Sequence, residues 1–114
     1  MEKEFIPYEQ ALALKELGFD KPCLGYYIEL RNPQEGILTI EKCENNFDGL
    51  LAPTFSQAFR WFREKYGLDS HIKKGKHGDY ILVITGYLED SWDEYEEAEL
   101  ECLIRLIELV KKQK

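Results

Sequence analysis

The chain has 114 residues, of which 44% are hydrophobic and 13% aromatic, and this fits a single domain over residues 1–114 that folds without a metal or a disulfide framework. Its formal net charge of -7 argues against a general coating of nucleic acid. The acidic start MEKEFIPYEQ lacks a signal-peptide pattern, and no apolar run approaches the ~20 residues that span a bilayer, so we expect a soluble, cytoplasmic protein with no membrane partner.

The first part of the chain predicts one helix and one hairpin. Pro7 suits the first turn of a helix and Gly18 its end, with apolar residues at helical spacing between them. Residues 24–30 then show the period-two pattern of a half-buried strand, and the segment NPQEG at 32–36 is typical of a turn. A second alternating stretch at 38–41 completes the hairpin. The apolar set of the first strand is Leu24, Tyr26, Ile28 and Leu30.

The middle of the chain predicts a loop and a second helix. Residues 43–53 follow neither period, so we expect a connecting loop there. Thr54 and Gln57 match the capping box, in which each side chain satisfies the free backbone N–H of the other residue. The helix that begins there should end at Gly67, as the first ends at Gly18. Its apolar face consists of Phe55, Ala58, Phe59, Phe62 and Tyr66.

The last part predicts a second hairpin and a long third helix. We expect strands at 70–73 and 80–88, the second from the run YILVITGYL, with the turn KKGKHGD between them. The third helix should run to about residue 112. Two pairs could cap its first turn: Ser91 with Glu94, or Asp93 with Glu96.

These elements predict an α+β fold in the order helix, hairpin, helix, hairpin, helix. Short hairpin links favour antiparallel pairing, so we expect one four-stranded antiparallel sheet made of the two hairpins, with the helices on one face. Each helix opens with a similar tetrapeptide: YEQA at 8–11, FSQA at 55–58 and YEEA at 95–98. Capping and an aromatic side chain near the first turn explain the likeness, so we interpret it as a rule for helix starts rather than a duplication.

Three blocks follow one another along the chain: IPYEQALALKELGFDKPCLGYY, LLAPTFSQAFRWFREKYGL and DSWDEYEEAELECLIRLIELVK. Together they cover nearly the whole chain, and their combination resembles a family of small proteins encoded by Bacteroides-type gut bacteria and by their phages or mobile elements. The resemblance implies a bacterial, intracellular setting and an origin on a mobile element. It implies no activity, no cofactor and no site residue.

The sequence carries no catalytic or metal-binding signature. The three cysteines, Cys23, Cys43 and Cys102, never form CxxC, and their odd number favours a reducing compartment. As possible metal donors, Cys23, Cys43, His71 and His77 lack the paired spacings of structural zinc. No neighbouring sequence marks a thiol as activated. We therefore expect a protein that is not an enzyme, with no catalytic residue, no metal and no cofactor.

Charge is unevenly distributed along the chain. Residues 60–76 hold six Lys and Arg residues against two acids, whereas residues 89–101 hold eight acids and no base. On a helical wheel Trp61 lies beside cations and can be partly exposed, and such aromatic and basic surfaces suit single-stranded nucleic acid. The alternative function is therefore a nucleic-acid-binding accessory protein that uses Arg60, Trp61, Arg63, Lys73, Lys74 and Lys76. The same pattern has a purely structural explanation, in which the lysines protect a solvated sheet edge from aggregation and Trp61 packs on the rim of the core.

The third helix carries more apolar surface than one sheet contact needs. Its apolar arc spans about 240°, whereas a helix lying on a sheet needs a stripe somewhat over 100° wide. A second stripe, formed by Leu100, Ile104 and Ile107, faces away from the first. It packs either against the first helix or against another protein. Our leading hypothesis is a small non-enzymatic protein-interaction module that binds a protein partner, or itself as a homodimer, through this stripe.

Overall fold

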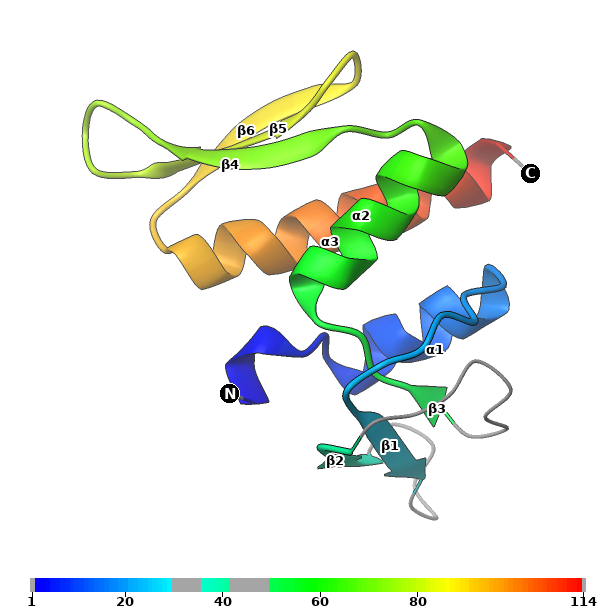
Figure 1. Ribbon diagram of the computed structural model, residues 1–114. Helices are drawn as coiled ribbons and strands as arrows, with labels where there is room; N and C mark the ends of the chain where they lie inside the picture. Colours follow the sequence, from blue (N-terminus) through cyan, green and yellow to red (C-terminus); the bar gives the residue numbers. More distant parts are fainter. Residues whose placement is uncertain (1, 30–35, 42–49, 114) are drawn as a thin grey trace. The chain divides into compact units, whose positions relative to one another are not determined.

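The computed structural model describes residues 2–29, 36–41 and 50–113. These residues form three α-helices and two three-stranded antiparallel sheets (Figure 1). The chain divides into two compact units, residues 1–57 and 58–114, and each unit is described by itself. The predicted α+β class is confirmed. The predicted four-stranded sheet is wrong, because each unit forms its own sheet of three strands.

The first unit contains the sheet β2–β1–β3. Its strands are β1 (Tyr26–Glu29), β2 (Gly36–Thr39) and β3 (Leu50–Leu51), and β1 pairs antiparallel with both neighbours. A 3-10 turn, η1 (Glu2–Glu4), and the helix α1 (Tyr8–Glu16) precede the sheet. The predicted loop at 43–53 is therefore wrong at its residues 50 and 51. The remainder of that loop up to residue 49, and turn residues 32–35, lie outside the described residues.

Hydrogen bonds join the N-terminal segment to one face of this sheet. The Ile6 N–H donates to the Pro53 carbonyl at 3.0 Å, and the Tyr27 hydroxyl donates to the Ile6 carbonyl at 2.8 Å. The Tyr27 ring also meets the ring of Tyr8, the first residue of α1, edge-on at 5.4 Å between centroids. Since Tyr27 contacts both Ile6 and Tyr8, the face of β1 that carries it is the one turned toward α1.

Two helices end with the same backbone motif, as their glycines predict. After α1, the Phe19 N–H donates to the Leu14 carbonyl at 2.9 Å, and Gly18 has φ 96°. This is the pattern in which a left-handed residue lets the chain turn back and satisfy the last carbonyls. The helix α2 (Phe55–Tyr66) repeats it around Gly67, whose φ is 68°.

The start of α2 forms only half of the predicted capping box. The Gln57 N–H donates to Thr54 Oγ1 at 3.2 Å, which satisfies one of the free donors of the first turn. Instead of returning to Thr54, the Gln57 side-chain amide donates to the Pro22 carbonyl at 2.7 Å. Gln57 thus connects the helix start to the segment that precedes β1.

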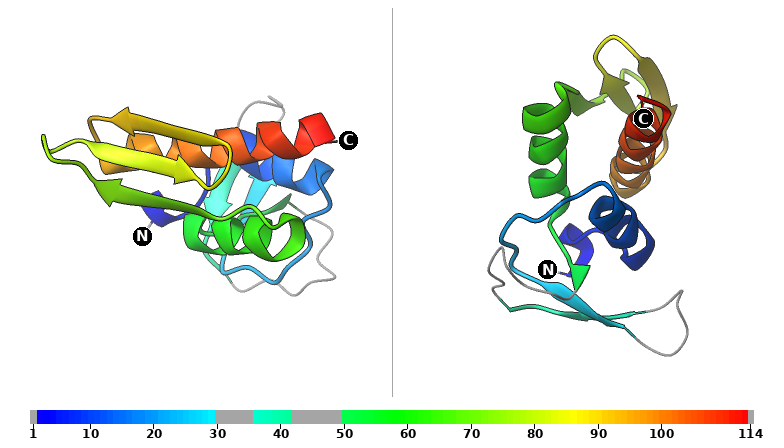
Figure 2. Two further views of the ribbon diagram at one scale, coloured as in Figure 1. Left: turned by 90° about the horizontal axis from the view of Figure 1, so that it is seen from above. Right: turned by 90° about the vertical axis from the view of Figure 1, so that its right-hand side faces the viewer.

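The second unit contains the sheet β4–β5–β6, with α2 and α3 on one side of it (Figures 1 and 2). Its elements are β4 (Ser70–Lys74), β5 (Tyr80–Ile84), β6 (Leu88–Trp92) and α3 (Tyr95–Gln113). In β5, the fully buried Leu82 and Ile84 alternate with half-buried residues. Because α3 packs on all three strands, this alternation places Leu82 and Ile84 on the helix-covered face.

The predicted strand at 80–88 is too long, because the run YILVITGYL contains β5, a turn and only the first residue of β6, Leu88. Gly86 has φ 86°, and the Tyr87 N–H donates to the Ile84 carbonyl at 2.9 Å, which reverses the chain after β5. The chain then returns as β6. Ser91 consequently lies in a strand and does not cap α3, which corrects one of the two predicted capping pairs.

Candidate functional site

The sheet of the first unit has an outer face opposite to the one turned toward α1. Side chains alternate along a strand, so this face carries Tyr26 and Ile28 of β1 beside Thr39 and Ile37 of β2. Ile28 and Ile37 are direct cross-strand partners, and they are 48% and 53% exposed. We name Tyr26, Ile28, Ile37 and Thr39 the β1–β2 strip.

Exposed apolar side chains gather on and around this strip. Among the described residues six large hydrophobic side chains are exposed, and four of them fall within residues 24–40: Leu24, Ile28, Ile37 and Ile40. The alternating pattern identified Leu24 and Ile28 as members of one apolar set. Alternation shows which residues share a face but not whether another element covers that face, so the openness of this face could not be predicted from the sequence.

A carboxylate lies at one end of the strip. The Tyr26 hydroxyl donates to Glu41 Oε2 at 3.4 Å, and this contact is exposed. Glu41 follows β2 directly beyond Ile40. The apolar surface is therefore bordered by a negative charge.

The residues of both predicted apolar stripes lie on the helix α3. Its buried residues are Ala98, Cys102, Leu103, Leu106, Ile107 and Val110. Of the predicted interface residues, Ile107 is 6% exposed, whereas Leu100 and Ile104 are half-buried. Leu100 and Ile104 thus keep accessible apolar area, and the assignment of all three residues to an interface stays a prediction.

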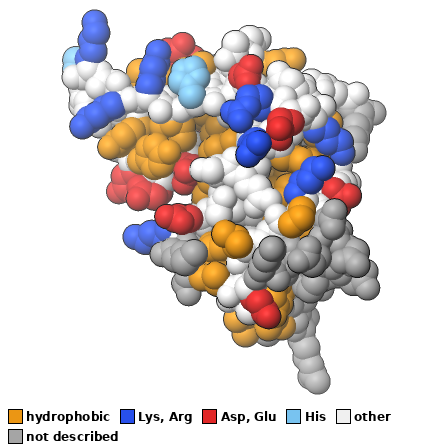
Figure 3. All heavy atoms as spheres, viewed as in Figure 1, with side chains coloured by type: hydrophobic (Ala, Val, Ile, Leu, Met, Phe, Trp, Pro, Cys, Tyr) orange, Lys and Arg blue, Asp and Glu red, His pale blue; other side chains and the backbone are white. Residues whose placement is uncertain are grey.

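Five of the six residues proposed for nucleic-acid binding are exposed. They are Arg60 and Arg63 on α2, Lys73 and Lys74 on β4, and Lys76 in the turn that follows. Arg60 is paired with Glu64 at 3.5 Å. On the face shown in Figure 3, basic side chains gather over the β4–β5 hairpin, while over α2 they are mixed with acidic ones.

Trp61, the sixth residue, is buried. It is 5% exposed, and its ring meets those of Phe62 and Tyr66 edge-on at 5.2 and 5.5 Å. The Lys65 ammonium lies 5.0 Å from the ring centroid, within cation–π range. The expectation of a partly exposed Trp61 is wrong, and a base could stack on this ring only by displacing its neighbours.

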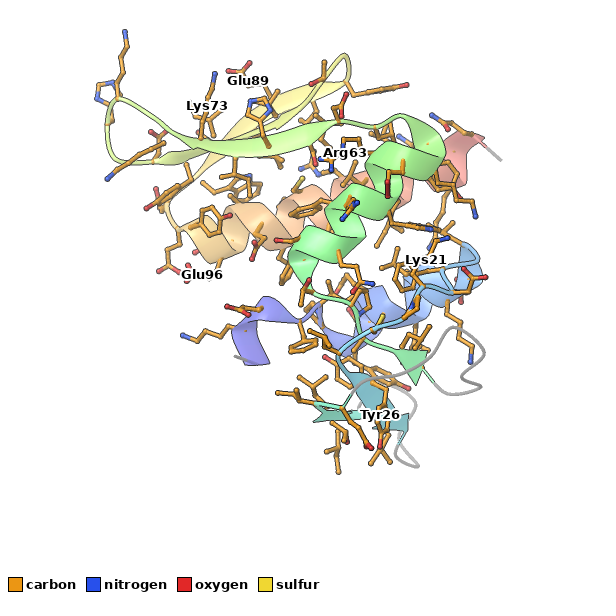
Figure 4. The ribbon with its side chains drawn as sticks, viewed as in Figure 1. Lys21, Tyr26, Arg63, Lys73, Glu89 and Glu96 are labelled. Atoms are coloured by element: carbon orange, nitrogen blue, oxygen red, sulfur yellow. The ribbon has the colours of Figure 1, made fainter. Side chains whose placement is uncertain are left out.

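The two edges of the sheet β4–β5–β6 carry opposite charges. Lys73 and Lys74 are exposed on β4, and Glu89 and Asp90 are exposed on β6. Figure 4 shows Lys73 and Glu89 pointing to the side of the sheet opposite α3. Two strand spacings, roughly 10 Å, separate the edges. In this unit one edge of the sheet is therefore positively charged and the other negatively charged.

The two cysteines that the structure describes have their thiols inside the fold. Cys23 and Cys102 are buried and free, and the Cys23 thiol donates to the Lys21 carbonyl at 3.2 Å. Burial raises the pKa of the Cys102 thiol to about 11, although a hydrogen bond with Ser70 acts to lower it. A thiol with a raised pKa stays protonated at neutral pH and is a poor nucleophile. Cys43 lies outside the described residues.

No group of three or more His, Cys, Asp or Glu side chains is placed to hold a metal ion within residues 2–29, 36–41 and 50–113. The two histidines that were considered as possible metal donors are exposed: His71 lies on β4 and His77 in the β4–β5 turn.

The second unit also has a small open pocket of about 220 Å³, which the sequence did not predict. It is lined by Tyr87, Leu88, Arg105, Glu108, Leu109 and Lys112. Arg105 is paired with Glu101 at 3.2 Å. Ligand pockets usually span roughly 300–1,000 Å³, so this pocket suits one side chain of a protein better than a cofactor.

Comparison with protein-family models, curated proteins and solved structures finds no match to the chain. Among the described residues, no helix is both long and apolar enough to cross a membrane.

Proposed function

We propose that the protein is a small, non-enzymatic protein-interaction module. The observation that carries this proposal is the concentration of exposed apolar side chains on and beside the β1–β2 strip. Single exposed hydrophobic residues are ordinary, whereas adjacent ones favour association. Ile28 and Ile37 are adjacent because they are cross-strand partners. Burying the exposed half of both side chains would stabilise a complex by about 2 kcal/mol.

Site-specific crosslinking tests this proposal. A photoreactive amino acid is placed at Ile37 and, as a control, at Lys15, which is exposed on α1. In cells that naturally produce the protein, we expect one discrete crosslinked species from position 37 and none from position 15. Adding Ile28→Thr to the position-37 variant should reduce the yield. Equal yields at the two positions would argue against the proposal.

The accessible apolar residues of α3 favour one form of this function, in which the protein binds a second copy of itself through that helix. Leu100 and Ile104 keep accessible apolar area next to the buried Ile107. Light scattering over a range of concentrations should give about twice the chain mass of 13.5 kDa if α3 pairs with a second copy. The Leu100→Asp, Ile104→Glu variant should then be a folded monomer. An unfolded variant would assign the stripe to the core.

Nucleic-acid binding is the alternative, and the exposed cations of the β4–β5 hairpin favour it. Lys73, Lys74 and Lys76 are all exposed, as phosphate contacts must be. Binding of single-stranded DNA should weaken with salt and fall in the Lys73→Glu, Lys74→Glu variant. Trp61→Phe should leave it unchanged, because the ring is buried. Binding that survives the double charge reversal would remove this alternative.

A further inference from the structure

The pocket of the second unit lies between the β5–β6 turn and the C-terminal half of α3. We infer that it binds a neutral aromatic side chain that carries a hydrogen-bond donor, a tyrosine or a tryptophan of a partner protein. This inference rests on the proposed interaction function and adds to it a second contact site with a stated ligand chemistry.

Two elements supply the residues that line the pocket. Leu88 is the cross-strand partner of Ile84, which lies on the helix-covered face, so Leu88 also points toward α3. Tyr87 lies in the turn and is 56% exposed, so a ligand can reach its ring. The helix contributes residues at positions i, i+3, i+4 and i+7, which share one stripe. They are Arg105, Glu108, Leu109 and Lys112.

The charges that line the pocket cancel. Arg105 is paired through its Nε with Glu101 at 3.2 Å. Glu108 and Lys112 have opposite charges, are both exposed and lie about one helical turn apart. A charged ligand would lose hydration on entry and would meet both signs at once, so it gains little electrostatic compensation. The pocket therefore favours a neutral ligand.

Two further charged residues are neighbours in sequence but do not line the pocket. Glu89 follows Leu88 on β6, and it points to the side of the sheet opposite α3 (Figure 4). Lys111 precedes Lys112 on α3, and one residue along a helix turns the side chain by about 100° around the axis. Neither residue changes the balance of charge inside the pocket.

The remaining features of the lining favour an aromatic ring with a donor. Leu88 and Leu109 are half-buried and supply apolar contact. The guanidinium of Arg105 offers a flat face on which a ring stacks. Glu108 takes part in neither salt bridge among the described residues, so its carboxylate can accept a hydrogen bond from a phenol O–H or an indole N–H. Tyrosine and tryptophan are also common anchor residues of protein interfaces.

The test uses the full chain with isotope-labelled leucine methyl groups and blocked single amino acids as probes. We expect N-acetyl-tyrosinamide to shift the methyl signals of Leu88 and Leu109 with a dissociation constant on the order of 1 mM. N-acetyl-phenylalaninamide lacks the donor and should bind about fivefold more weakly, the change for one net hydrogen bond. The aspartyl and lysyl counterparts carry a charge and should bind more weakly still.

Substitutions at the pocket locate the contacts. Glu108→Ala removes the acceptor at an exposed helix position, so the preference for the tyrosine probe over the phenylalanine probe should disappear. Glu97→Ala, also exposed on α3 but outside the lining, is the matched control and should keep the preference. Tyr87→Ala should weaken binding of both aromatic probes, whereas Tyr87→Phe keeps the ring and should retain it.

Three results would overturn the inference: no shift at either leucine, a charged probe that binds as tightly as N-acetyl-tyrosinamide, and an unchanged preference in Glu108→Ala. The crosslink from position 37 separates this inference from the proposed function. If that crosslink forms while no probe binds, the interaction function stands and the pocket has no part in it. If the tyrosine probe binds as described while positions 37 and 15 crosslink equally, the ring site stands and the proposed function fails.

Discussion

The Tyr27 hydroxyl donates a hydrogen bond of 2.8 Å to the carbonyl of Ile6, a residue with no exposed surface. Tyr27→Phe removes the donor and leaves this carbonyl unpaired, so the free energy of unfolding in urea should fall by about 1–2 kcal/mol. Tyr26→Phe is the matched control, because its exposed hydroxyl makes a longer bond of 3.4 Å to Glu41. We expect it to cost less than about 0.5 kcal/mol. Equal costs would show that the Tyr27 bond contributes nothing specific.

The contribution of the Thr54 cap to the free energy of unfolding should also be measurable in urea. Its Oγ1 accepts the Gln57 N–H at 3.2 Å, and loss of such a cap typically costs about 1 kcal/mol. Thr54→Ala should lower the urea midpoint accordingly, whereas Thr54→Ser, which keeps the acceptor, should restore most of it. Ser56→Ala, at an exposed position in the same turn, is expected to have little effect. A Thr54→Ser variant as unstable as Thr54→Ala would point to the lost methyl group instead of the cap.

The turn between β5 and β6 depends on Gly86. At φ 86° a β-carbon there would meet no atom of a described residue within 4 Å, so only backbone strain opposes a side chain. Gly86→Ala should cost about 1–2 kcal/mol in thermal unfolding. Gly86→Asn should cost less, because asparagine tolerates the left-handed region. If both substitutions were neutral, the turn would have to adopt another conformation.

The buried Cys102 thiol predicts a stability change in alkaline solution. Its pKa is about 11 in the folded protein against an ordinary value of 9.0. Between these values the unfolded thiol ionises while the folded one stays protonated, so ionisation favours the unfolded state. The contribution of the protonated thiol to the free energy of unfolding is complete below about pH 9 and is lost as the pH rises toward about 11. Wild type should lose up to about 2 kcal/mol more than Cys102→Ala over this window in urea titrations. Parallel losses would contradict the burial of the thiol.

The sequence was most informative about helix ends, because their signals act within one turn. The three aromatic tetrapeptides begin α1, α2 and α3 at Tyr8, Phe55 and Tyr95. Their alanines, Ala11, Ala58 and Ala98, are at most 1% exposed. Gly18 and Gly67 follow helix ends with positive φ. Caps and left-handed glycines need no distant partner, so local composition was enough to place them.

Strand pairing was harder, because it depends on residues far apart in the chain. Leu50 and Leu51 pair with β1, yet two residues cannot display a period. The run at 80–88 is apolar on both sides of Gly86, so it matches one long strand as well as a hairpin. With β3 and β6 both missed, the remaining strands fit a single four-stranded sheet, and the division into two sheets was not predictable.

The exposure of residues on the candidate binding surfaces was hard to predict for the same reason, because it depends on residues far apart in the chain. Alternation placed Ile28 in an apolar set, but its exposure of 48% follows from the absence of a covering element among the described residues. Trp61 falls between the apolar and basic faces of a helical wheel, and packing with Phe62 and Tyr66 decides its burial. Composition identifies such residues as candidates, and only the tertiary contacts show which of them a partner can reach.

The charge division across the sheet β4–β5–β6 has a consequence for the behaviour of concentrated solutions. Lys73 and Lys74 on one edge and Glu89 and Asp90 on the other let neighbouring molecules attract edge to edge, against the repulsion of a net charge of -7. Screening lengths grow from about 8 Å at physiological salt to about 30 Å in dilute buffer. The repulsion between the net charges reaches further than the attraction between the edges, so the second virial coefficient should fall when salt is first added. The fall should be steeper for the Lys73→Glu, Lys74→Glu variant, whose net charge is more negative.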